Sequence, residues 1–300
     1  MGQDLEGGAT TVDLESKVSE LLTVTSIAEH PGTFVRRHGL VVTEFGHLSQ
    51  DSCNLCWLVD TSAGRLFVRP QAPRVHSRLE PRVPCLNHES RVRLLRNAIE
   101  LAASCRHTAL ARLLNVIESP AGPALIYEAA VGELVGVARE RRADPASAYQ
   151  RFAHLPADHL LAIFDVLLDL HAVLAKAGWV AGDLYDGCLI IDFATERLTV
   201  VDLDNYRRAP STNDMGRMFG STRFMAPDEF ELGAPIDERT TVFNLGRLVW
   251  HFGTRLSERV EDFCGPPALA QVTQQAYQPS RIARPPSVAS FVDAWTSARH

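Results

Sequence analysis

The sequence has no apolar stretch that approaches the ~20 residues a membrane helix needs. Its N-terminal stretch has no basic region followed by an apolar core, so we expect no secretory signal there. It also has no basic run interleaved with aromatic residues, and its 36 acidic residues outnumber its 30 Lys and Arg. This charge balance is not typical of nucleic-acid-binding proteins. We therefore expect neither a membrane nor a nucleic acid as a partner.

Cysteine is scarce, with six residues in the chain. Cys53 and Cys56 form a lone CxxC pair. A zinc site would need two more ligands at comparable spacing, and the sequence offers no second pair of this kind. We therefore interpret the cysteines as reduced thiols of a cytoplasmic protein.

The 300 residues, 46% of them hydrophobic and 22% charged, suffice for a large core in one two-lobed domain or two small domains. Short β-type runs predict strands at 40–43, 55–59, 66–69 and 124–128. Spaced apolar residues predict helices over 11–30, over about 20 residues from Asn87 or His88, over 157–177 and over 288–295. Two further runs, at 188–191 and 198–201, predict a hairpin. The fold class is therefore α+β.

Three motifs follow one another between residues 178 and 229. The first is Asp183-Leu184, which precedes an apolar run. The second is Asp202-Leu203-Asp204, which ends a β-type run. The third is the stretch GSTRFMAPDE at 220–229. Their order resembles the catalytic loop (HRDLxxxxN), the metal-binding loop (DFG) and the activation-segment end (GTxxYMAPE) of protein kinases.

The chain thus resembles the protein-kinase-like superfamily, in particular bacterial serine/threonine protein kinase-like proteins of actinobacterial type. The resemblance covers roughly residues 35–298. It implies a two-lobed kinase-like fold with a small β-rich N-lobe and a larger helical C-lobe. We expect an N-terminal helical extension at 1–34, the N-lobe at 35–128 and the C-lobe at 129–300.

The chemistry of such a site explains why two aspartates stand on adjacent loops. Phosphoryl transfer needs an oriented hydroxyl and a metal ion that neutralises the phosphate charge. The resemblance implies that Asp183 positions the acceptor hydroxyl and that Asp202 binds Mg²⁺ or Mn²⁺ with ATP. Asp183 and Asp202 are 19 positions apart in sequence, which leaves room for one loop and one hairpin.

The nucleotide-binding residues are implied by the resemblance alone. Arg69 occupies the place of the third-strand Lys, where it could bind phosphate or simply reach solvent. Gly46 is the only glycine in the hairpin tip that would cover the phosphates, so the GxGxxG pattern is absent. The backbone from Glu128 to Ala130 matches the hinge that receives adenine. The family's helix Glu falls at Ala98, which leaves Glu89 and Glu100 as unassigned neighbours.

The catalytic loop departs from the family pattern. Ala181-Gly182 replaces His-Arg, which makes control by phosphorylation of a loop doubtful. The expected metal-binding Asn is Cys188, whose sulfur is a poor Mg²⁺ ligand. Asp186 could substitute for it, or could belong to a simple turn. Asp204 adds a possible oxygen ligand after Asp202.

The activation-segment end is the most specific of the three motifs. Thr222 is interpreted as its Thr, and Asp228 or Glu229 as its acid. In kinases that acid pairs with a distant Arg, and Arg284 lies in a matching context. Thr241 stands where the family has an Asp that braces the catalytic loop. Because its partner position, Ala181, has changed as well, we expect a rebuilt loop.

Two functions remain open. The first is ATP-dependent transfer of a γ-phosphate to a hydroxyl of a protein Ser/Thr or of a small metabolite. Retention of both aspartates favours it. The second is a pseudokinase that binds nucleotide or a protein partner without transfer, which the missing Gly-rich loop, Lys and Asn favour.

Overall fold

The computed structural model describes residues 20–45, 56–61, 64–70 and 87–299. The fold is mixed α+β with an antiparallel sheet. The chain divides into two compact units, Met1–Ile99 with Arg112–Ala129 and Glu100–Ala111 with Ala130–His300. Of the described residues, no helix is long and apolar enough to cross a bilayer.

The first unit is built on a five-stranded sheet with the order β1-β2-β3-β5-β4, in which all neighbours are antiparallel. Its elements are α2 (Pro31–His38), β1 (Leu40–Phe45), β2 (Cys56–Thr61), β3 (Gly64–Pro70), α3 (His88–Ser104), β4 (Leu113–Ile117) and β5 (Ala124–Glu128). The division between the two units falls within α3. The strand over 124–128 lies where its apolar run predicts it.

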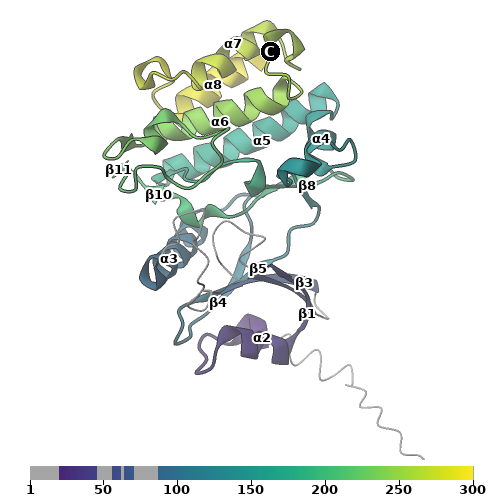
Figure 1. The fold of residues 1–300 in the computed structure, drawn as a ribbon, viewed down its shortest axis with the longest axis vertical. Helices are drawn as coiled ribbons and strands as arrows, with labels where there is room; N and C mark the ends of the chain where they lie inside the picture. The colour runs from purple at the N-terminus through teal and green to yellow at the C-terminus, as the bar shows by residue number, and fades with distance from the viewer. Residues whose placement is uncertain (1–19, 46–55, 62–63, 71–86, 300) are drawn as a thin grey trace, which may run out of the picture. The chain divides into compact units, whose positions relative to one another are not determined.

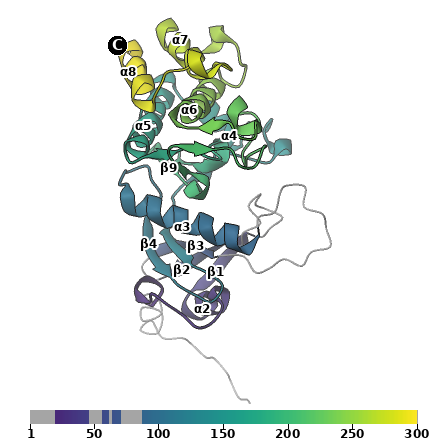
Figure 2. The ribbon, with the colours of Figure 1, turned by 90° about the vertical axis from the view of Figure 1, so that its left-hand side faces the viewer.

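The two faces of this sheet bury different helices, because successive side chains of a strand point to opposite faces. On β5, Ala124 and Ile126 belong to a cluster with Phe34 of α2. Leu125, between them, packs instead with Leu95 of α3. Figures 1 and 2 show the two helices on opposite sides of the strands.

The helix α2 also settles where the N-terminal stretch ends. The boundary expected between residues 34 and 35 falls inside this helix. Leu21, Phe34 and Val35 share one buried cluster with Trp57 of β2. Residues 20–38 are therefore part of the first unit and not a separate extension. Of the helix expected over 11–30, residues 11–19 lie outside the described residues, and residues 20–23 are helical. Residues 24–30 are not helical, so the expectation is wrong there: Ser26 forms a β-bridge with Glu118 instead.

The second unit is mainly helical. Its elements are β6 (Glu133–Leu134), η1 (Arg139–Arg141), α4 (Ala148–Ala153), α5 (Ala157–Lys176), β7 (Trp179–Val180), η2 (Asp186–Cys188), β8 (Leu189–Asp192), β9 (Arg197–Val200), η3 (Leu203–Asn205), β10 (Arg207–Arg208), β11 (Ser211–Thr212), η4 (Pro227–Phe230), β12 (Pro235–Ile236), α6 (Glu238–Gly253), η5 (Val260–Asp262), α7 (Pro267–Ala276), η6 (Arg281–Ala283) and α8 (Val288–Arg299). The helices α5, α6, α7 and α8 lie against one another (Figure 1).

The apolar spacing of α5 explains its central place in this unit. Leu160, Phe164, Leu167 and Leu174 are buried and belong to the largest core cluster. Short strand pairs then hold the connecting loops against this core. The hairpin β8–β9 forms a three-stranded sheet with β6, β7 pairs with β10, and β11 pairs with β12. These pairs fix the loops that carry the motifs.

Candidate active site

Asp183 lies between β7 and η2, with its backbone in the left-handed region at φ 62°. The loop that carries it is fastened to α6, because the backbone N–H of Ala181 donates to the Thr241 hydroxyl at 2.9 Å. Both groups are buried. Thr241 therefore braces this loop through a neutral hydroxyl, where the kinase family uses a carboxylate at the matching position.

The loop of Asp202 meets the loop of Asp183 around Cys188. The Cys188 thiol donates to the carbonyl oxygen of Asp183 at 3.1 Å. The carbonyl oxygen of Cys188 accepts from the N–H of Val201, one residue before Asp202, at 2.9 Å. Asp202 itself has a left-handed backbone, φ 63° and ψ 46°, at the start of η3. Two hydrogen bonds of Cys188 thus connect the loop of Asp183 to the loop of Asp202.

The electrostatics of Cys188 report the same proximity. Burial raises the pKa of the Cys188 thiol well above its ordinary value, and the neighbouring carboxylates of Asp183 and Asp202 raise it further. The thiol therefore stays protonated and serves as a donor. A neutral thiol is a poor ligand for Mg²⁺, which prefers oxygen.

A second contact joins the loops from the other side. The carbonyl oxygen of Asn205 packs against Gly182 so closely that a Cβ on Gly182 would overlap it. The Asn205 side chain donates to the Oδ2 atom of Asp183 at 3.3 Å. Glycine at position 182 therefore permits the approach that brings this amide to the candidate catalytic carboxylate.

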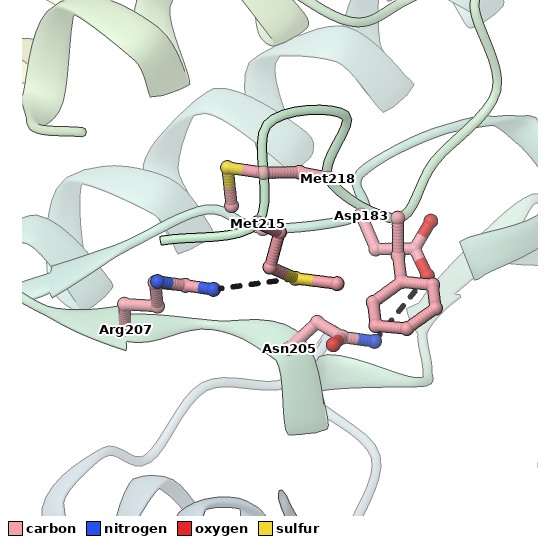
Figure 3. Close-up of a pocket in the computed structure, with 7 residues that line it drawn as sticks. Asp183, Asn205, Arg207, Met215 and Met218 are labelled. Carbon is pink, nitrogen blue, oxygen red and sulfur yellow. Dashed lines mark hydrogen bonds between the residues drawn. The ribbon is translucent and has the colours of Figure 1, made fainter. Parts of the chain in front are cut away.

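Asp183 opens into a small pocket, drawn in Figure 3. Its lining residues are Gly182, Asp183, Asn205, Arg207, Met215, Met218 and Phe219. In Figure 3, Asp183 and Asn205 lie on one side, Arg207 on the other, and Met215 between them. The cavity volume is about 10 Å³, roughly the room that one water needs. The pocket beside Asp183 is therefore small.

The wall opposite Asp183 is held by a buried asparagine, Asn213. Its Oδ1 atom accepts from the backbone N–H groups of Met215 and Gly216, each at 3.0 Å. Its Nδ2 atom donates to the carbonyl oxygen of Asp228 at 3.1 Å. Asn213 therefore links the segment at Met215, which lines the pocket, to the loop at Asp228.

Asp186, which the sequence allowed as a metal ligand or as part of a turn, pairs with an arginine. It is buried in η2, and both of its carboxylate oxygens accept from Arg223, at 2.9 and 2.7 Å. An aspartate paired in this way has its charge compensated within the protein. The sequence did not indicate that Arg223 would reach back to this loop.

The residues expected to hold a metal fit a phosphate-bound ion better than a metal cage. Among the described residues, no group of three or more His, Cys, Asp and Glu side chains is arranged to hold a metal. Mg²⁺ commonly binds through one or two carboxylates together with substrate phosphates. Asp202 and the buried Asp204 provide carboxylates on one short loop. The donor set is therefore compatible with Mg²⁺ or Mn²⁺ delivered with a nucleotide.

The activation-segment end is anchored by a buried ion pair. Arg284 donates to both oxygens of Asp228, at 2.9 and 3.3 Å, and Arg281 adds a contact at 2.5 Å. The sequence left open which acid meets Arg284, and the structure selects Asp228. Glu229 instead accepts from the Ala226 N–H at 2.6 Å and from Asn244 at 2.7 Å.

Thr222 occupies a different place from the one its motif implies. It is exposed on the surface. The family pattern has its Thr directly after the Gly, and here that position is Ser221. Gly220 lies beside Asp183, since a Cβ on it would stand 3.5 Å from Oδ1 of that aspartate. The segment therefore reaches Asp183 through residues 219–221 and not through Thr222.

None of the expected nucleotide-binding residues that the structure describes lines this pocket. Arg69 is buried in β3 of the first unit, where its backbone pairs with Leu125. Glu128 ends β5, is exposed, and lies 3.4 Å from the guanidinium of Arg112. Ala130 begins the next segment of the second unit. Gly46 lies outside the described residues.

The helix Glu that kinases pair with their Lys has no counterpart at the matching position. Ala98 packs in the apolar cluster of Leu95 and Leu125. Glu100 accepts from Arg208 at 2.5 and 3.0 Å. Glu89 is exposed in the first turn of α3.

A polar chain that the sequence did not indicate links the buried Tyr149 and His251 to the exposed Glu258. The Tyr149 hydroxyl lies 2.6 Å from Nε2 of His251, whose Nδ1 lies 2.6 Å from Glu258. Arg223 extends the chain from Tyr149 to Asp186. Burial opposes the charge of Glu258, but hydrogen bonds from His251 and Arg247 lower its pKa to about 2. No local pattern signals this chain, because its members come from separate elements.

Comparison with known proteins adds no family. No protein-family model matches the chain, and no curated protein matches it.

Proposed function

We propose that this protein is an ATP-dependent phosphotransferase with a two-lobed protein-kinase-like fold. The observation that carries the proposal is the junction around Cys188. It brings the loops of Asp183 and Asp202 together by two hydrogen bonds. A hydroxyl-orienting carboxylate and a metal-binding carboxylate on adjacent loops are what phosphoryl transfer requires.

In this proposal Asp183 acts on the acceptor. Its Oδ2 atom accepts from Asn205, so Oδ1 accepts the hydrogen bond of an acceptor hydroxyl in the pocket. The hydroxyl oxygen bonds to the γ-phosphorus of ATP as the bond from that phosphorus to the bridging oxygen breaks, and ADP leaves. Asp183 takes the proton of the hydroxyl and releases it to solvent. Asp202, with Asp204, would hold Mg²⁺ or Mn²⁺, which would supply charge neutralisation at the phosphates.

The nucleotide-binding roles in this proposal come from the resemblance to protein kinases. Arg69 would bind phosphate, and the backbone from Glu128 to Ala130 would receive the adenine. Gly46, which the resemblance places over the phosphates, lies outside the described residues. The acceptor is a protein Ser/Thr or a small metabolite, in a cytoplasmic setting.

Two specific observations favour a second function. Cys188 is a buried neutral thiol in the place of a metal-binding Asn, and the pocket beside Asp183 is small. Both features suit a pseudokinase that binds nucleotide or a protein partner and transfers no phosphate.

Incubation with radiolabelled ATP and Mn²⁺ separates the two functions. We expect slow release of labelled phosphate to water, and faster transfer to a hydroxyl acceptor where one is supplied. Asp183→Asn should abolish both while nucleotide binding persists. Turnover in Asp183→Asn equal to that of the parent protein would rule out the role of Asp183. Binding of ATP without turnover in the parent protein would favour the pseudokinase.

A further inference from the structure

Asn205 stands at the point where the two motif loops touch, and no motif of the sequence singles it out. It is the last residue of η3, three positions after Asp202. Its backbone carbonyl meets Gly182, and its side chain meets Asp183. One residue thus contacts the candidate catalytic loop twice, through backbone and side chain.

The position of Asn205 is fixed by its neighbours in sequence. Tyr206, which follows it, is buried, and its hydroxyl lies 2.8 Å from Nε2 of His171. His171 is itself held by the carbonyl oxygen of Leu167 at 2.7 Å, inside α5. Arg207 then pairs in register with Val180 of β7. The amide of Asn205 therefore projects from a segment fastened to the central helix and to β7.

The contact gives the two oxygens of Asp183 different surroundings. The Oδ2 atom accepts from the Asn205 amide at 3.3 Å, the hydrogen bond drawn in Figure 3. The Oδ1 atom lies toward Gly220, whose neighbour Phe219 lines the pocket. A carboxylate with one oxygen held by a fixed donor has a defined orientation for the other.

We propose that Asn205 is the positioning residue for Asp183. The inference rests on the proposed phosphotransferase function and adds to it. Cys188 cannot donate an amide hydrogen bond to Asp183, and Asn205 in the loop of Asp202 donates one instead. Asn205 holds Oδ2 so that Oδ1 points at the acceptor hydroxyl. Its effect falls on turnover and not on nucleotide binding.

The test compares the parent protein with Asn205→Ala and Asn205→Asp. Asn205→Asp keeps the shape but loses the donor and adds a like charge. Gln278→Ala is a matched control, because it removes an exposed amide far from the pocket in sequence. Release of phosphate from ATP and Mn²⁺ gives kcat and KM for each. We expect kcat of Asn205→Ala to fall about 10- to 100-fold, the scale of a misplaced catalytic group. KM for ATP should change less than about twofold, because the substitution removes no interaction that binds ATP equally in the ground state and the transition state.

A second measurement does not depend on activity. The loss of unfolding free energy caused by Asn205→Ala is measured twice, once in the parent protein and once in the Asp183→Ala variant. If the two residues are in contact, the Asn205→Ala change costs less stability once Asp183 is gone. We expect this non-additivity.

Two outcomes overturn the inference in an active parent protein. One is a kcat for Asn205→Ala equal to that of Gln278→Ala. The other is an equal cost of Asn205→Ala in both backgrounds. A parent protein that releases no phosphate at all is a different result. It rejects the phosphotransferase function itself, and with it the positioning role.

Discussion

Arg284 and Asp228 stand 56 residues apart in sequence and form a buried, two-pronged ion pair. Both oxygens of the carboxylate accept from the guanidinium. The pair joins the end of the candidate activation segment to the loop before α8. It also orders the wall of the pocket, because Asn213 donates to the carbonyl of the same Asp228.

Loss of one partner of this pair should be costly. Arg284→Met removes the two-pronged partner of the buried Asp228 carboxylate and leaves it with Arg281 and the Thr240 hydroxyl. We expect the free energy of unfolding to fall by about 3 kcal/mol, the lower end of the cost of removing one partner of a buried ion pair, because Arg281 still compensates part of the charge. Arg259→Met is the matched control, because its pair with Glu261 is exposed and such pairs contribute about 0–1 kcal/mol. Urea unfolding of both variants measures the difference, and equal stabilities would refute the anchoring role.

Glu229 should make the protein less stable at alkaline pH. Burial raises the pKa of Glu229 from 4.5 to about 7, and the hydrogen bonds from Asn244 and Ala226 only partly offset this. Because the folded state binds the proton more tightly, the stabilising contribution is complete below pH 4.5 and is lost as pH rises through 7.

Urea unfolding of the parent protein and of Glu229→Gln checks this sign. The stability of the parent protein relative to the variant should fall by roughly 2–3 kcal/mol between pH 5 and pH 8. Glu261→Gln, at an exposed carboxylate, serves as the control and should show no such trend. Parallel curves for Glu229→Gln and the parent protein would contradict the prediction.

His171 should limit stability on the acid side. Burial lowers the pKa of His171 from 6.5 to about 4, although its hydrogen bond to Leu167 acts in the opposite direction. The folded state keeps this ring neutral, with Nδ1–H donating to Leu167 and Nε2 accepting from Tyr206. Its contribution is present above pH 6.5 and is lost as pH falls through 4.

The variant His171→Gln cannot titrate at this position. Relative to it, the parent protein should lose roughly 2–3 kcal/mol of stability between pH 7 and pH 4. His159→Gln is a control at a partly exposed histidine whose pKa is raised by its hydrogen bond to Glu196. A constant difference between the parent protein and His171→Gln across this pH range would show that folding does not lower the pKa of this ring.

Gly182 should tolerate no side chain. A Cβ at this position would overlap the Asn205 carbonyl, so Gly182→Ala must push the two motif loops apart. We expect a loss of about 1–3 kcal/mol, the usual cost of overpacking, together with loss of phosphate release. Gly216→Ala is a control for backbone strain without overlap, because its φ of 79° disfavours Ala but nothing lies within 4 Å of the added Cβ. Full activity in Gly182→Ala would show that the contact is dispensable.

Local patterns were sufficient to predict much of the secondary structure. The helix predicted over 157–177 is observed as Ala157–Lys176, and the hairpin at 188–201 is observed as β8 and β9. The apolar periodicity of α5 reflects the burial of one helix face against the core, and this pattern is visible in the sequence. The strand β4 and the helix α7 were missed. Three of the five residues of β4 are partly buried hydrophobics, and α7 begins at a proline, so neither presents a clear period.

The site was only partly predictable, for a different physical reason. Asp183 and Asp202 could be singled out because each follows a recognisable local pattern. Asn205 and Arg223 could not, since their roles arise from contacts between loops. The contact of Asp186 could not be predicted for the same reason: the sequence shows a carboxylate in a loop but not the distant Arg223 that pairs with it.

The most direct test of the account is a thermal-shift titration with ATP, with and without Mg²⁺ or Mn²⁺, on the parent protein and on Asp202→Ala. A ligand at about 100 times its Kd adds roughly 2.7 kcal/mol of stability, which moves Tm by a few degrees. The account predicts a metal-dependent rise in Tm for the parent protein that is lost in Asp202→Ala. No rise under any condition, or an equal rise in Asp202→Ala, would contradict a nucleotide site built on this aspartate.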